Sequence, residues 1–157
     1  MGDPIKVAIV DDDEGFRQAA RGWLDGAGDI LIVGEAQSGQ GMTRWLRQVQ
    51  PNVVLMDVTA ASAVQMRQVT ALAGVIVLHG AGQEPLVLEA LRAGALGHLE
   101  KHNVRPPQAL AAIRTVSRGQ AVLSPGLAGR IVDEVAERYR EGGADDQYPN
   151  TPIPNTQ

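Results

Sequence analysis

Ionisable side chains follow several apolar stretches of this sequence. Residues 5–10 run into Asp11 and Asp12, residues 52–56 run into Asp57, and Lys101 ends a further apolar stretch. If these stretches are strands of one parallel sheet, their carboxyl ends meet at the same edge. Carboxylates that converge repel one another, which raises a pKa or recruits a cation. The pattern therefore predicts a reactive or cation-binding site at that edge.

The expected chemistry follows from the types of residue. Carboxylate oxygens in an open site suit a hard cation such as Mg²⁺. With Lys101 nearby, a carboxylate could attack a phosphoryl group, because the two cations would stabilise the developing negative charge. Each residue alone has an ordinary explanation: Asp13 is expected to cap a helix, and a single lysine usually lies on the surface. The combination at the strand ends favours a site.

The elements that must position these residues are visible in the hydrophobic pattern. Five apolar, β-branched stretches predict strands at residues 5–10, 30–36, 52–57, 75–79 and 95–101. The first, third and fourth are nearly continuous, as strands covered on both faces should be. Segments with helical spacing separate them, and the first of these is expected to stop near Gly28. Alternation of this kind predicts a doubly wound α/β fold with a five-stranded parallel sheet.

The C-terminal part has a different character. Ser124 as an N-cap and Pro125 at the first helical position predict an extra helix. Its apolar stripe consists of Ala128, Ile131, Val132, Val135 and Tyr139. We expect a main domain over residues 1–120, a linker helix over 121–141, and a disordered linker or tail over 142–157.

Composition excludes several classes of protein. The net charge is −4, from 14 basic and 18 acidic residues, which argues against a strongly basic nucleic-acid surface. Cysteine is absent, which excludes disulfides and thiolate sites. The acidic N-terminus does not look like a signal peptide, and no apolar stretch approaches a membrane span. We therefore expect a cytoplasmic protein with no membrane contact.

The motifs "VDDDE", "VVLMD", "ALRAGALGHLEK" and "AAIRTVSRGQAVLSP" resemble the receiver domains of two-component response regulators, which have a CheY-like, flavodoxin-like fold. The last two motifs are similar to the NarL/LuxR-type branch. The resemblance implies the strand order 2-1-3-4-5 and no enzyme activity. It also implies phosphorylation by a histidine kinase, and DNA binding only through a helix-turn-helix domain absent from this chain.

The resemblance further implies roles for individual residues. Asp57 would be the phospho-acceptor, and Lys101 would contact the phosphoryl group. Asp11 and Asp12 would hold Mg²⁺ together with Asp57 and the backbone carbonyl of Thr59.

Three features depart from the family pattern. His79 stands where the family has the hydroxyl switch residue that also contacts the phosphoryl group, and His98 stands at the usual aromatic switch position. After Asp57 the chain has neither proline nor glycine until Gly74, so we expect a short or irregular third helix. These changes favour an atypical receiver that is controlled by ligand binding or by dimerisation alone, or that is permanently active. The alternative is a conventional receiver phosphorylated on Asp57.

Two other interpretations remain open. The segment "HGAGQEP" superficially resembles a phosphate-binding loop, which would indicate a nucleotide- or small-ligand-binding protein of the same fold. The aspartates after the first strand would repel such an anion. Alternatively, the chain is an interaction module that forms homodimers through the fourth helix, fifth strand and fifth helix, or through the C-terminal helix.

Overall fold

The computed structural model describes residues 2–143. The five strands are β1 (Ile5–Val10), β2 (Ile30–Ala36), β3 (Val53–Asp57), β4 (Gly74–His79) and β5 (Gly97–Glu100). The helices are α1 (Glu14–Leu24), α2 (Met42–Val49), α3 (Ala63–Thr70), α4 (Glu84–Arg92), α5 (Pro106–Ser117) and α6 (Pro125–Gly143). The chain divides into two units after Leu123, and α6 belongs to the second. The predicted tail falls largely at residues 144–157, outside the described residues.

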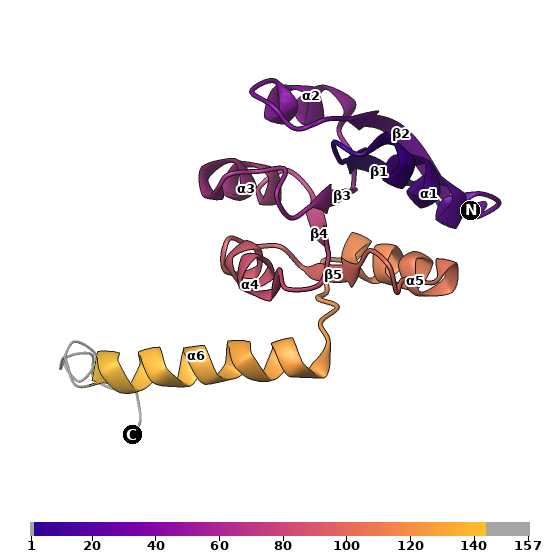
Figure 1. Cartoon of the computed structure of the whole chain (residues 1–157). Helices are drawn as coiled ribbons and strands as arrows, with labels where there is room; N and C mark the ends of the chain where they lie inside the picture. The colour runs from indigo at the N-terminus through magenta and orange to yellow at the C-terminus, as the bar shows by residue number, and fades with distance from the viewer. Residues whose placement is uncertain (1, 144–157) are drawn as a thin grey trace. The chain divides into compact units, whose positions relative to one another are not determined.

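The sheet confirms the predicted architecture. All neighbouring strands are parallel, in the order β2-β1-β3-β4-β5. Helices α1 and α5 cover one face, and α2, α3 and α4 cover the other (Figure 1). The extra C-terminal helix is also present. In the described part of the chain, no helix combines the length and apolar character needed to cross a membrane.

The three central strands form the core. Residues 7–10 of β1, 53–56 of β3 and 75–78 of β4 are all fully buried. Side chains of α1 and α5, including Ala20 and Ile113, pack against one face of this layer. Burial on both faces explains why these strands read as continuous apolar stretches rather than as alternating patterns.

The bounds of α1 and β5 differ in part from those that the sequence predicts. The helix α1 ends at Leu24, so the stop expected at Gly28 is wrong: Asp25 is extended, and Gly26 adopts a φ of 85°. The third helix is short, as expected, and begins with a capping box formed by Ser62 and Gln65. Strand β5 is shorter than the predicted 95–101, and Val122 bridges to Gly97 on its outer side.

The sheet packs closely against α5 at Gly74. A Cβ atom at this position would lie 2.5 Å from a methyl carbon of Val116 and 3.2 Å from its carbonyl oxygen. We expect Gly74→Ala to lower the free energy of unfolding by about 1–3 kcal/mol, as overpacking does. Urea denaturation would measure it. Gly22→Ala is the control, since Gly22 lies within α1 with open space around it. It should stabilise the protein by about 0.5–1 kcal/mol. Equal effects of both substitutions would contradict this packing.

Candidate functional site

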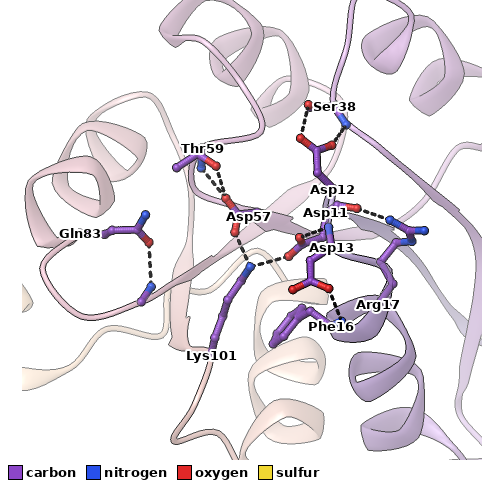
Figure 2. A network of polar contacts seen from close by, with 11 residues as sticks. Asp11, Asp12, Asp13, Phe16, Arg17, Ser38, Asp57, Thr59, Gln83 and Lys101 are labelled. Carbon is purple, nitrogen blue, oxygen red and sulfur yellow. Dashed lines mark hydrogen bonds and ion pairs between the residues drawn. The ribbon is translucent and has the colours of Figure 1, made fainter.

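Three strand ends bring Asp11, Asp57 and Lys101 together, as the sequence predicts. The Lys101 ammonium forms an ion pair with Asp11 Oδ2 at 2.7 Å and a second ion pair with Asp57 Oδ2 (Figure 2). The Asp11 side chain is buried, with only 3% of its surface exposed. Its Oδ2 is closed off from solvent and is balanced by the ammonium rather than by a well-aligned hydrogen bond.

The second carboxylate oxygen of Asp57 is held by Thr59. Asp57 Oδ1 accepts hydrogen bonds from the Thr59 backbone N–H at 2.8 Å and from its hydroxyl at 2.5 Å. Burial alone would raise the pKa of Asp57, but hydrogen bonds from Lys101 and Thr59 outweigh it and hold the pKa below its usual value. Asp57 is therefore anionic at neutral pH, and both of its oxygens have partners.

Both the backbone and the side chain of Lys101 make contacts that hold the residue in place. Its backbone N–H donates to the His79 carbonyl at 2.8 Å, which continues the pairing of β5 with β4. Its ammonium also lies 4.5 Å from the centre of the Phe16 ring, within range of a cation–π contact. Burial would lower the pKa of Lys101, but Asp11 and Asp57 raise it overall. The lysine is therefore a fixed positive charge.

Asp12 has a different environment. Its carboxylate accepts hydrogen bonds from the Ser38 backbone N–H at 2.7 Å and from the Ser38 hydroxyl at 2.8 Å. Figure 2 shows it directed toward Ser38, whereas Asp11 and Asp57 face Lys101. The two hydrogen bonds from Ser38 lower the pKa of Asp12. Asp13 accepts a hydrogen bond from the Phe16 N–H at 3.2 Å and caps α1.

The residues present are chemically suited to a hard cation. Asp11 and Asp57 present oxygens toward one positive charge, and Asp11 Oδ2 is buried without a well-aligned donor. As the side chains lie, no group of three metal-ligating His, Cys, Asp or Glu forms within residues 2–143. Asp11, Asp57, the Thr59 carbonyl and a reoriented Asp12 would hold Mg²⁺. When bound, Mg²⁺ would supply positive charge to a transferring phosphoryl group. The ligand role of the Thr59 carbonyl stays a prediction.

The two predicted switch residues contact each other. His79 Nε2 lies 3.2 Å from His98 Nδ1, and the ring centres are 5.3 Å apart. His79 Nδ1 lies 3.2 Å from the Gly80 carbonyl, which can only accept a hydrogen bond. His79 Nδ1 must therefore carry a proton, and in the neutral pair His98 Nδ1 donates to His79 Nε2. Burial, followed by the proximity of His79, lowers the pKa of His98.

The loop that resembled a phosphate-binding segment has an internal partner. The Gly80 N–H, which such a loop would direct at an anion, donates to the side-chain oxygen of Gln83 at 2.7 Å (Figure 2). Gly82 adopts a φ of 80°, which accounts for a glycine there. This hydrogen bond gives the loop a local structural role.

Sequence reasoning missed three residues around the pocket: Phe16, Arg17 and Ser38. Arg17 donates to the Asp11 carbonyl at 2.5 Å and pairs with Glu35 at 3.3 Å. Ser38 follows β2, so it lies at the same edge of the sheet as the aspartates. A search for every polar residue after every strand, rather than for charged residues and histidines alone, would have found it.

Comparison with known proteins settles the family. The family described as the response regulator receiver domain matches residues 7–114, which is more than half of the chain. This chain belongs to the response regulator receiver domain family. The transcriptional regulatory protein YxjL of Bacillus subtilis is 30% identical over 150 residues, which are 92% of this chain and 68% of YxjL. Response regulator UvrY of Escherichia coli K12 is 32% identical over 133 residues, 81% of this chain and 61% of UvrY.

Solved receiver structures share the fold. A LuxR-family two-component response regulator from Aurantimonas sp. SI85-9A1 superposes with a TM-score of 0.70 at 24% identity, covering 85% of this chain and 99% of that chain. This likeness shows the shared fold, and the sequence relatives are response regulators of the NarL/LuxR type. This chain spans 61–68% of the length of YxjL and UvrY.

The histidine pair predicts a pH dependence for the receiver. The pKa of His98 lies below the usual 6.5 in the folded state, so the unfolded state binds more protons as pH falls below that value. The free energy of unfolding should therefore decrease between about pH 7 and about pH 5. His98→Gln should flatten this slope in urea titrations, whereas His102→Gln, at an exposed position, should leave it unchanged. An unchanged slope in His98→Gln would contradict the assignment.

Proposed function

We propose that this chain is the signal-input receiver of a cytoplasmic transcription regulator, and that its switching differs from standard phosphorylation. It is a binding and relay module rather than an enzyme, and DNA binding belongs to a helix-turn-helix domain outside this chain. The names of its relatives support the link to transcription: YxjL is a transcriptional regulatory protein and UvrY a response regulator.

The contact between His79 and His98 is the observation that supports switching by a route other than standard phosphorylation. The family switch needs a hydroxyl that can move toward the phosphoryl group. Here His79 already makes contacts at 3.2 Å through both ring nitrogens, to His98 and to the Gly80 carbonyl. Movement into the pocket would break both contacts. Each costs roughly 1 kcal/mol, which reduces the coupling between Asp57 and β5.

A conventional receiver is the second candidate, because the core of the pocket is intact. Asp57 lies beside Lys101, and Asp11 completes the charge triad. In that case a histidine kinase would phosphorylate Asp57 with Mg²⁺ present. The family assignment favours both receiver candidates over the nucleotide-binding alternative.

Phosphate transfer separates the two candidates. We expect that incubation with acetyl phosphate and MgCl₂, followed by an acid quench and intact mass spectrometry, gives no more phosphorylated protein than Asp57→Asn gives. The physical reason is that the hydrogen bonds from Ser38 direct Asp12 away from Asp57, which leaves the cation site that the transfer needs incomplete. A phosphorylated species that disappears in Asp57→Asn would support the conventional receiver and overturn the atypical one.

We also propose that α6 mediates homodimerisation. Ala128, Val132, Val135 and Tyr139 follow the 4-3-4 spacing of a coiled-coil seam, and the last three are exposed by 64%, 59% and 80%. The flanking positions in this register include Ile131 and Ala136, whereas every acidic residue of α6 lies at an outer position. A second parallel copy would therefore meet an apolar seam without repulsion between carboxylates.

Sedimentation velocity at several concentrations tests the seam. Val135→Asp should weaken dimerisation by about tenfold or more, because it places a charge within an apolar interface. Glu137→Asp is the control at an exposed outer position and should have no effect. A dimer that resists Val135→Asp would point instead to the surface formed by α4, β5 and α5.

A further inference from the structure

The hydrogen bonds between Asp12 and Ser38 oppose the binding of a cation in the acidic pocket. Both oxygens of the Asp12 carboxylate have a Ser38 donor: Oδ1 accepts from the backbone N–H and Oδ2 from the hydroxyl. The carboxylate is thereby directed to the loop after β2 and away from the ammonium that Asp11 and Asp57 share (Figure 2). A cation held by all three aspartates therefore requires Asp12 to give up contacts with Ser38.

The loop that carries Ser38 is itself anchored. The Gln65 amide donates to the Gly39 carbonyl at 3.2 Å, and the same side chain accepts from the Ser62 N–H at 3.0 Å in the capping box of α3. The residue next to Ser38 is thus tied to the start of α3. With the loop in this position, a turn of the Asp12 carboxylate toward Lys101 breaks its hydrogen bonds from Ser38.

We propose that Ser38 is a positioning residue that holds Asp12 out of the cation site and thereby lowers the affinity of the receiver for Mg²⁺. This inference rests on the proposed role of the acidic pocket as the cation site. It assigns a function to a residue that makes no contact with Asp57 or Lys101 in the network described above. It also gives the atypical pocket a physical cause, since Asp12 is present in the sequence but engaged elsewhere.

Isothermal titration of the purified chain with MgCl₂ tests the proposal. Ser38→Ala removes the hydroxyl donor and frees Asp12 Oδ2, so the Kd for Mg²⁺ should fall roughly three- to tenfold, as expected for one hydrogen bond to a carboxylate. Ser38→Thr keeps the hydroxyl and should bind as the unaltered chain does. Circular dichroism would verify that each variant is folded.

A double-mutant cycle with Asp12→Asn separates positioning from a general loosening of the loop. If Ser38 acts through Asp12, the gain from Ser38→Ala should disappear in the Asp12→Asn background. An unchanged or higher Kd in Ser38→Ala would overturn the proposal, and so would an equal gain with and without Asp12. Mg²⁺ binding by the unaltered chain without a gain in Ser38→Ala would refute only the role of Ser38. No binding by any variant would refute both Ser38 and the cation site.

Discussion

The Lys101 ammonium is the interaction on which the pocket depends. Two carboxylates lie at the ends of buried strands, and Asp11 is almost wholly removed from solvent. A buried carboxylate without a partner is strongly unfavourable, so a positive charge must lie within reach. Lys101 supplies it from β5, while its backbone N–H is held by the His79 carbonyl of β4. A single residue thus joins the ends of β1, β3, β4 and β5.

This arrangement determines how a signal could leave the pocket. A change at Asp57 reaches the rest of the domain through its two partners, Lys101 and Thr59. Lys101 connects to β4 and β5. There both ring nitrogens of His79 already have partners, the Gly80 carbonyl and His98, and a movement of His79 would break these contacts. In the proposed atypical receiver, movement of β5 in response to Asp57 therefore costs the contacts of His79. An input that acts on the association of α6 would not have to cross this barrier.

Much of the fold and part of the site could be predicted because their causes are local in the sequence. Continuous apolar stretches identify β1, β3 and β4, and parallel order then brings Asp11, Asp57 and Lys101 to one edge. The orientation of Asp12 could not be predicted in this way. β1 ends at Val10, so the alternation of side chains along a strand does not determine where Asp11 and Asp12 point. Ser38 carries no charge, and its role depends on its hydrogen bonds to Asp12, which is distant in the sequence.

The segment after Asp57 shows how a missing motif is replaced. It lacks the usual proline and glycine, yet the Ala60 N–H donates to the Asp57 carbonyl at 2.9 Å and the Val58 N–H to the Leu78 carbonyl at 2.8 Å. The Ser62 cap then starts α3. The backbone here is therefore held by hydrogen bonds that any residue type except proline can donate.

The carboxylate oxygens of Asp57 and Asp12 already have partners within the protein. Thr59 and Lys101 occupy those of Asp57, and Ser38 occupies those of Asp12. A pocket that its own lysine and serine already satisfy gains less from an added cation than one whose charges are unbalanced. In the atypical receiver that we propose, the altered chemistry follows from the partners of its aspartates rather than from their loss.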